Sequence, residues 1–186
     1  MPVQTPTEPT DAEVIAQALG DPNRFEYIFE RHFTAIYRYL RRRVGDDLAQ
    51  EFAAETFSRA FAQRERFSPD ATSALPWLFG IAGNVVRMHR RSEVRRPRAW
   101  ARAAAQPMRP DDTLDRLDTQ GTDPRVAAAL AALSTNQREV LLLHAWAELS
   151  DTEIAEALGV NAATVRSRLA RARARAARAL TDEDSQ

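Results

Sequence analysis

Apolar residues recur at helical spacing along two stretches of this sequence, and a segment without this spacing separates them. In the first stretch the spacing predicts long helices that begin near Phe25, Asp47 and Pro76. In the second stretch, residues 124–180, it predicts four shorter helices. Prolines and clustered aspartates replace the pattern between residues 97 and 123, which indicates a linker. Because no segment alternates as a strand would, we predict an all-α protein of two small helical domains joined by a flexible linker.

These changes in pattern also predict the domain boundaries. The first residues are rich in proline and threonine, so we expect them to be loosely ordered. The last residues are acidic and follow the final helix. The expected segments are a lead over 1–20, a first domain over 21–96, an acidic proline-rich linker over 97–123, a second domain over 124–180 and an acidic tail over 181–186.

Charge is segregated along the chain although it sums to zero. The 26 basic residues are all arginine and balance 26 acidic residues. Arginines concentrate in residues 87–102 and 166–178, whereas acids dominate the first thirty residues and residues 111–123. The local sign, more than the sum, decides how each segment meets a charged partner. A net charge of zero therefore does not exclude binding to nucleic acid.

The sequence argues against several classes of function. It contains no cysteine, which excludes a disulfide framework and a thiolate zinc site. It has no glycine-rich phosphate loop, nucleophile elbow or metal-ligand spacing, so we expect no enzymatic activity, no catalytic residue, no cofactor and no metal. No segment is apolar enough to insert into a membrane, and the N-terminus does not resemble a signal peptide. We therefore expect a cytoplasmic protein.

The segment from Ser150 to Arg171 has the layout of a helix-turn-helix. A Ser-x-x-Glu capping box opens a short helix, Gly159 ends it, and Asn161 can cap a second helix a few residues later. The second helix would expose side chains that read base edges and hold phosphates, namely Asn161, Thr164, Arg166, Ser167, Arg168 and Arg171. The second domain is therefore expected to bind DNA in the major groove.

The alternative for the arginines alone is a solvated basic helix that pairs with an acidic surface such as residues 111–118. However, no acidic residue occurs between Ala157 and Leu180, and the small Ala155 would allow the two helices to approach. The capping boxes that begin at Ser134 and Ser150, the turn glycine and the small residue together favour DNA binding over this alternative.

Both halves resemble the extracytoplasmic-function (ECF) sigma factors of bacterial RNA polymerase, which belong to the sigma-70 family. The family's domain for the minus-thirty-five promoter element is similar to LSTNQREVLLLHAWAELSDTEIAEALGVNAATVRSRLARAR. Its polymerase-binding and minus-ten-binding helices are similar to QEFAAETFSRAF and PWLFGIAGNVVRMHRR. The order of these segments, on either side of an acidic linker, makes the resemblance specific.

The resemblance implies a transcription initiation factor that binds core polymerase, directs it to promoters and promotes DNA melting. It assigns the minus-thirty-five contacts to the second helix of the helix-turn-helix, with Ala163 added to the six residues named above. It implies minus-ten contacts by Asn84, Arg87, Met88 and Arg91, and capture of an extruded base by the loop from Phe67 to Ser73, which includes Asp70.

The resemblance further implies that an acidic row binds the clamp helices of the polymerase beta-prime subunit, through Asp47, Gln50, Glu51 and Glu55. Carboxylates of this kind can dock on a basic pair of helices. A di-iron carboxylate site is the enzymatic alternative, but the sequence contains no Glu-x-x-His pair. The neighbouring aromatic residues Phe52 and Phe57, and also Trp77, are expected to lie in the core.

The implied partners are core RNA polymerase, through the clamp helices and the beta flap, promoter DNA and an anti-sigma factor, without membrane insertion. The competing interpretation is a helix-turn-helix regulator that binds DNA without polymerase, fused to an unrelated helical module. That interpretation leaves the acidic and basic helices of the first domain unexplained. Binding to core polymerase distinguishes the two.

Overall fold

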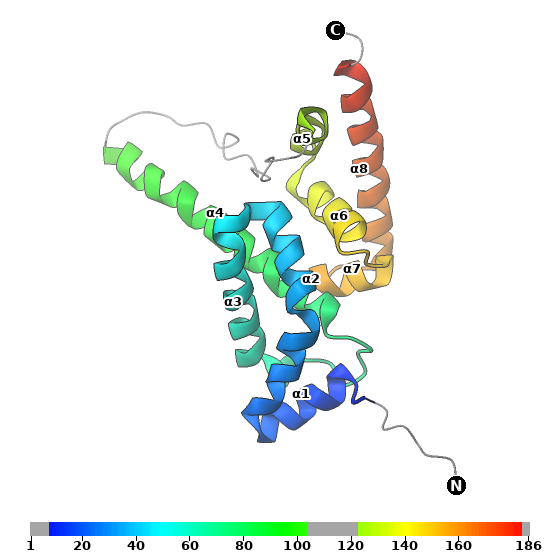
Figure 1. Ribbon diagram of the computed structural model, residues 1–186. Helices are drawn as coiled ribbons and strands as arrows, with labels where there is room; N and C mark the ends of the chain where they lie inside the picture. The colour runs from blue at the N-terminus through cyan, green and yellow to red at the C-terminus, as the bar shows by residue number, and fades with distance from the viewer. Residues whose placement is uncertain (1–7, 104–122, 184–186) are drawn as a thin grey trace.

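A computed structural model describes residues 8–103 and 123–183 of the chain (Figure 1). The described residues contain no strand, which confirms the all-α fold. The first half consists of the α-helices α1 (Asp11–Gly20), α2 (Glu26–Val44), α3 (Asp46–Ala62) and α4 (Leu75–Ala103). It also contains two short 3-10 helices, η1 (Pro22–Phe25) and η2 (Arg64–Arg66). The second half consists of α5 (Pro124–Ala131), α6 (Thr135–Trp146), α7 (Asp151–Leu158) and α8 (Ala162–Glu183).

Helix α1 corrects the prediction of a loosely ordered lead, because residues 11–20 are helical and buried on one side. Thr10 and Glu13 form a capping box at its start, and Val14, Ile15 and Ala18 are buried. The capping-box signal that predicted the helix after Ser150 was therefore also present here, as Thr-x-x-Glu. The proline-rich residues before it masked this signal, and residues 1–7 of the predicted lead lie outside the described residues.

The three long helices of the first half begin close to the predicted positions. Gly45 separates α2 from α3 with a φ of 83°, a conformation that glycine adopts without steric cost. Helix α3 ends at Ala62, and η2 follows it. Helix α4 continues to Ala103, so it extends into the segment predicted as the linker. Residues 104–122 of that segment lie outside the described residues.

The second half is held together around Arg138 at the start of α6. Its guanidinium donates hydrogen bonds to the carbonyl oxygens of Leu130 at 2.8 Å, Leu133 at 3.0 Å and Ala131 at 3.3 Å. The carbonyls of Leu130 and Ala131 lie at the end of α5, where a helix lacks internal partners for its last carbonyl groups, and Leu133 lies in the turn that follows. Arg138 therefore ties α5 to α6 and completes the end of the shorter helix.

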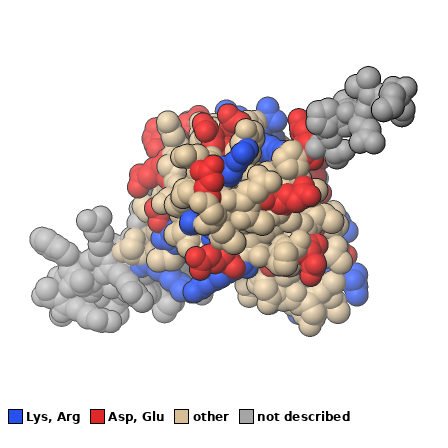
Figure 2. All heavy atoms as spheres, turned by 90° about the horizontal axis from the view of Figure 1, so that it is seen from below, with Lys and Arg blue, Asp and Glu red and all other residues tan. Residues whose placement is uncertain are grey.

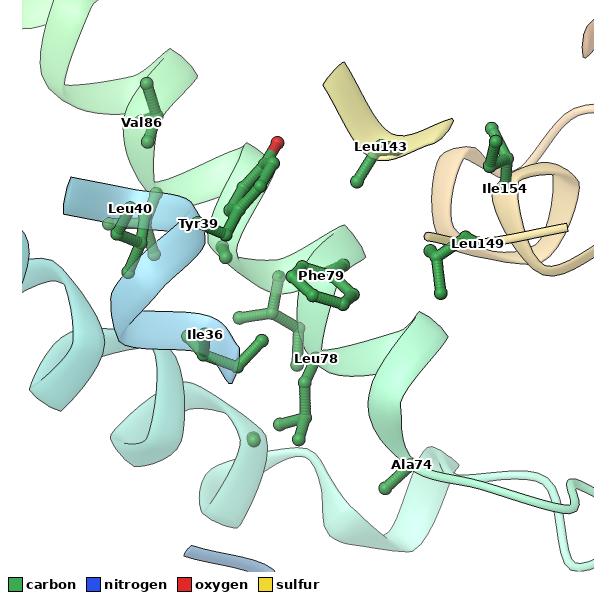
Figure 3. Packing of buried hydrophobic residues seen from close by; sticks show 14 of the residues in the cluster. Ile36, Tyr39, Leu40, Ala74, Leu78, Phe79, Val86, Leu143, Leu149 and Ile154 are labelled. Atoms are coloured by element: carbon green, nitrogen blue, oxygen red, sulfur yellow. The ribbon is translucent and has the colours of Figure 1, made fainter. Parts of the chain in front are cut away.

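One continuous apolar core joins the two halves of the protein. Figure 3 shows Tyr39 of α2 and Phe79 of α4 facing Leu143 of α6, with Leu149 and Ile154 beside them. The rings of Tyr39 and Phe79 meet edge to face, with centroids 5.1 Å apart. The sequence predicted two domains but not this packing between them. Whether each half folds by itself stays a prediction.

The start of α1 is fixed to the rest of the first half by the buried carboxylate of Asp11. It accepts hydrogen bonds from the backbone N–H of Ala74 at 2.7 Å and from Arg31 at 3.1 Å, and it lies 2.7 Å from Nε2 of His32. Burial raises the pKa of this carboxyl group, but the hydrogen bonds from His32, Ala74 and Arg31 together hold it well below its usual range. Asp11 thus joins α1 and α2 to the residues that lead into α4.

We expect Asp11→Asn to lower the free energy of unfolding by about 2–3 kcal/mol at pH 7, because the buried donors lose their charged acceptor. Since folding lowers the pKa of Asp11, its stabilisation is present above the unfolded-state value of about 3.9 and is lost as the pH falls further. Urea unfolding measured between pH 7 and pH 2 should therefore show the difference shrinking in acid.

The matched control is Glu8→Gln, because Glu8 also approaches Arg31, at 4.0 Å, but is almost fully exposed. That change should leave the unfolding midpoint unaltered. Equal effects of the two substitutions would contradict the central role of Asp11.

Candidate nucleic-acid interface

The turn between α7 and α8 is built by the three local signals that the sequence contains. Ser150 Oγ accepts from the backbone N–H of Glu153 at 3.4 Å, and the Glu153 carboxylate accepts from the Ser150 N–H at 2.8 Å. Gly159 ends α7 in the left-handed conformation, with a φ of 63°. Asn161 Oδ1 then accepts from the N–H of Thr164 at 2.7 Å and caps α8. The predicted helix-turn-helix is confirmed.

Packing behind α8 decides which of its sides faces outward. Val165, Leu169 and Ala172 are buried together with Ile154 of α7. Their spacing forms a narrow apolar stripe along one side of α8. The opposite side is therefore left toward solvent.

The seven residues predicted to contact the minus-thirty-five element lie on the outward sides of this helix and its turn. The structure leaves Asn161, Ala163, Arg166, Ser167 and Arg171 exposed, and Thr164 and Arg168 half-buried. Arg171 donates to the Ser167 carbonyl oxygen at 3.2 Å and to its Oγ at 3.0 Å, so these two side chains form one polar unit. Its oxygen accepts one hydrogen bond in capping the helix, so Asn161 keeps both amide N–H groups and one lone pair of Oδ1 for another partner.

Helix α4 presents the residues predicted for the minus-ten element as one row. Asn84, Met88 and Arg91 are exposed, and their spacing with Arg87 places all four on one side of the helix. Arg87 donates a hydrogen bond to Asn84 and lies 3.9 Å from the carboxylate of Glu139. Asp70 is exposed but lies on the loop between η2 and α4, apart in sequence and on a different element.

The aromatic residues beside that loop are packed rather than presented to solvent. Phe67 is buried against the half-buried ring of Trp77, with centroids 5.2 Å apart. Ser73 Oγ lies 3.4 Å from the Asp11 carboxylate and accepts from the N–H of Leu75 at 3.1 Å. The end of this loop is therefore fixed, and Phe67 is not available as a stacking surface.

The predicted acidic row lies along the exposed side of α3. Asp47, Gln50 and Glu51 are exposed, whereas Glu55 is half-buried and pairs with Arg59 at 2.6 Å. A surface hollow of about 580 Å³ lies between this row and helix α4. The floor of the hollow includes Phe52, which is buried and meets His89 edge to face at 4.9 Å. The predicted burial of Phe52 is thereby confirmed.

Phe57 is also buried, as predicted, against Phe29 of α2 at a centroid distance of 5.0 Å. The face of the molecule in Figure 2 carries acidic and basic side chains side by side, and neither sign covers it alone. Both signs on one face agree with a chain whose formal charge sums to zero.

A buried ionic cluster that was not predicted from the sequence lies between the two halves. Arg43 of α2 donates to both carboxylate oxygens of Glu139 of α6, at 2.7 and 2.6 Å. The Arg43 side chain is 1% exposed and the Glu139 side chain 4%. Tyr39 donates to Glu139 at 3.5 Å and accepts a hydrogen bond from Arg43. The only available sequence signal for this cluster was a charged residue at a buried position of a helix. Such a signal does not indicate which residue of the other half is the partner.

The cluster shifts the pKa values of several of its titratable groups. Burial alone would raise the pKa of Glu139. The charge of Arg43 and its hydrogen bonds lower this pKa by more than burial raises it, so the net shift is downward. Burial, with repulsion from Arg43 and Arg138, lowers the pKa of Arg90 to about 10. Burial also raises the pKa of Tyr39, which therefore stays protonated. At neutral pH the cluster thus contains one carboxylate among several guanidinium groups.

Comparison with protein families identifies both halves of the chain. The family model for Sigma-70 region 2 matches residues 28–96, and the model for Sigma-70 region 4 matches residues 124–175. The two matches together cover more than half of the chain and define a sigma factor with two conserved regions.

Curated relatives specify the group. The ECF RNA polymerase sigma factor SigC of Mycobacterium tuberculosis is 34% identical over 169 residues, which cover 89% of this chain and 88% of that protein. SigL of the same species is 31% identical over 160 residues, with 85% and 89% covered. This chain belongs to the ECF family of RNA polymerase sigma factors, which are transcription initiation factors rather than catalysts.

Solved structures agree with this assignment. The structure of CnrH in complex with the cytosolic domain of CnrY has a TM-score of 0.64 and 30% identity, and covers 94% of this chain and 98% of that chain. The sigma factor RpoE in complex with the anti-sigma factor NepR, from Bartonella quintana, has a TM-score of 0.58 at 23% identity, with 84% and 96% covered. The second likeness supports the fold alone.

Within residues 8–103 and 123–183, no group of three or more histidine or acidic side chains could hold a metal ion. In the same part of the chain, no helix has the length and apolar character needed to cross a bilayer.

The turn of the helix-turn-helix provides a prediction about Gly159. An added Cβ would meet open space there, so the cost of Gly159→Ala comes from the left-handed backbone alone. We expect this change to lower the free energy of unfolding by about 1–2 kcal/mol. Urea unfolding followed by circular dichroism would measure it.

Gly20→Ala is the matched control, because a Cβ at Gly20 also meets open space and no positive φ opposes it. It should be neutral or stabilise by up to about 1 kcal/mol. Similar losses for both variants would contradict a backbone origin.

Proposed function

We propose that this sigma factor uses three exposed helical surfaces at once. The row on α3 binds core polymerase, the row on α4 contacts the minus-ten element, and the outward side of α8 reads the minus-thirty-five element. The observation that carries the proposal is that each row of polar side chains has a packed apolar side behind it. Such rows can make contacts to a partner without disturbing the core.

On α8 we assign base reading and phosphate binding to different residues. Arg166, Ser167 and Arg171 lie in the first turns of the helix, where a recognition helix contacts base edges. Arg178 lies seven residues beyond Arg171, which corresponds to about 10 Å along a helix. At that distance we expect contact with phosphate groups rather than with bases.

On α4 the row Asn84, Arg87, Met88 and Arg91 supplies hydrogen-bonding groups and positive charge for a DNA strand, and Met88 adds an exposed apolar side chain. Capture of an extruded base by the loop that contains Asp70 is part of the same proposal. Because Phe67 is packed against Trp77, recognition in this loop would rely on hydrogen bonding by Asp70 and Thr72, both exposed. The loop would then contribute specificity rather than stacking.

The polymerase-binding surface is the exposed part of the acidic row. Asp47, Gln50 and Glu51 have free approach from solvent, and the half-buried Glu55 keeps its charge paired with Arg59. We propose that this row binds the clamp helices of the beta-prime subunit and that the second half contacts the beta flap. In this proposal the protein acts by binding alone, in the cytoplasm, without a cofactor or a catalytic residue.

An anti-sigma factor is a further proposed partner. CnrH was solved with the cytosolic domain of CnrY, and its structure covers nearly all of this chain. That arrangement supports a regulatory protein that binds this sigma factor in the same way.

Glu51→Arg should weaken binding to core polymerase at least tenfold, because it places a like charge opposite the proposed basic surface. The change should leave helical content unaltered, since Glu51 is exposed. Binding can be measured by fluorescence titration of labelled sigma factor with core enzyme. The control is Glu30→Arg, an equivalent change at an exposed position of α2. Equal affinity of both variants and the wild type would exclude this surface.

Arg171→Ala should cost about 1–3 kcal/mol at one base pair and relax the preference there, whereas Arg178→Ala should weaken binding to all promoters alike. The measurement is transcription by reconstituted holoenzyme on a library of promoters with single changes in the minus-thirty-five element. Binding at several salt concentrations should show a smaller salt dependence for Arg178→Ala. The same shift in sequence preference for both variants would show that the division of α8 is incorrect.

A further inference from the structure

The contact between the two halves is closest along helix α4. A Cβ on Gly80 would lie 2.4 Å from the carbonyl oxygen of Ala157 in α7, and a Cβ on Gly83 would lie 2.7 Å from Oε1 of Glu139. Both glycines are buried in the middle of a helix. The absence of side chains at these two positions allows the second half to sit directly on α4.

The charges at this contact come from different halves. Arg43 and Arg87 belong to the first half and Glu139 to the second, and Arg90 donates to the carbonyl oxygen of Arg43 at 3.4 Å. Arg138 is engaged with the end of α5 and would leave with the second half. If the halves separate, the arginines of the first half lose the carboxylate that now neutralises them.

Glu139 is also an incomplete partner for Arg43. The two terminal nitrogens of the guanidinium are bonded to it, but the buried Nε of Arg43 donates to no acceptor in the described part of the chain. A guanidinium has five N–H donors in a planar arrangement that suits oxyanions with several oxygens. A phosphate group can accept the same paired hydrogen bonds and offers further oxygens.

The position of the cluster indicates which phosphate could bind. Arg87 is 3.9 Å from Glu139 and at the same time belongs to the exposed row of α4 proposed for the minus-ten element. A DNA strand lying on that row would therefore bring its backbone next to Arg87. Arg43 is the adjacent guanidinium on the inner side.

The proposed function requires the halves to separate. The two promoter elements are centred roughly 25 base pairs apart, which is about 85 Å of duplex at 3.4 Å per base pair. Two halves in direct contact through α4 and α7 cannot occupy both elements. Separation would therefore expose the arginine cluster at the moment when DNA reaches α4.

We propose, resting on the function proposed above, that Arg43 and Arg87 form a binding site for the phosphodiester backbone of DNA and that Glu139 occupies this site while the halves are packed together. Glu139 acts as an internal competitor of phosphate. Arg43 is then a DNA-binding residue that is concealed in the packed form.

The test uses a substitution that opens the contact without changing any charge. Gly80→Ala places a methyl group against the backbone of Ala157, which cannot move aside as a flexible side chain could. Opening is measured as a longer distance between spin labels on Thr34→Cys and Ala177→Cys, both exposed positions in a chain that has no cysteine of its own. Gly20→Ala, where a Cβ meets open space, is the control for the added methyl group.

Binding is measured with the full chain and a fluorescein-labelled single strand of twenty thymidines, at several concentrations of NaCl. We expect Gly80→Ala to bind more tightly than the wild type. Adding Arg43→Gln should weaken the Gly80→Ala protein about fivefold at 0.1 M NaCl and lower its salt slope by about 0.7, the value for one contact to single-stranded DNA. Adding Glu139→Gln instead should change neither quantity, because the competitor has already been displaced.

The control for the lost charge is Arg38→Gln in the Gly80→Ala protein, since Arg38 is an exposed arginine of the same helix. An effect as large as that of Arg43→Gln would overturn the proposal, because any arginine would then serve. Equal binding by wild type and a Gly80→Ala protein that the spin labels show to be open would also overturn it. Glu139→Gln alone is the second route: it should raise affinity, and a decrease in a folded protein would contradict the competitor role.

These outcomes are independent of polymerase. Failure of wild-type protein to bind core enzyme would contradict the proposed function and leave the arginine site standing. Normal promoter-specific transcription together with no effect of Arg43→Gln would contradict the arginine site and leave the function standing.

Discussion

The ion pair between Arg43 and Glu139 fixes how the two halves of this sigma factor meet. Both side chains are withdrawn from water, and they meet through two short hydrogen bonds. Removing one partner of such a buried pair typically costs about 3–5 kcal/mol, whereas replacing both by apolar groups can be neutral. The pair therefore adds little net stability, and its main effect is to disfavour other arrangements of the two halves. A shift of the halves that breaks the pair but keeps both side chains out of water leaves a charge buried without a partner.

Helix α4 is the element on which the remaining structure depends. One side packs on α2 and α3 through residues such as Leu78 and Val86, and a second side meets α7 at Gly80. The third side presents the polar row that begins at Asn84. A glycine in a helix interior costs about 1 kcal/mol relative to alanine. Here the close approach to Ala157 requires it, so local helix stability is given up for contact between the halves.

Local features of the fold were predictable because their signals lie within a few residues. Ser150, Gly159 and Asn161 each act on neighbours one turn away, and the sequence predicted the helix-turn-helix from them. The start of α1 has the same signal at Thr10 but was missed beside a proline-rich segment. Exposure of the α8 residues followed from its apolar stripe, which a sequence can indicate.

The contact between the halves was not predictable in this way. Arg43 and Glu139 are 96 residues apart, and a helical pattern reports only which side of each helix is buried. Arg87 illustrates the consequence. The family resemblance implied that it contacts DNA, whereas the structure also places it 3.9 Å from Glu139. The predicted DNA surface and the contact between the halves thus share a residue, a relation that appears only once α4 and α6 are placed together.

The packed form conceals one kind of proposed DNA contact and leaves another exposed. Phosphate contacts supply the sequence-independent part of affinity, whereas base contacts discriminate between sites. In the first half Arg43 is buried, while on α8 Arg166 and Arg171 remain exposed. Long-range attraction to DNA also depends on net charge, which is zero here. In the proposed mechanism, the burial of Arg43 and the zero net charge both reduce binding to arbitrary DNA by the free protein. Only the zero net charge persists after the halves separate.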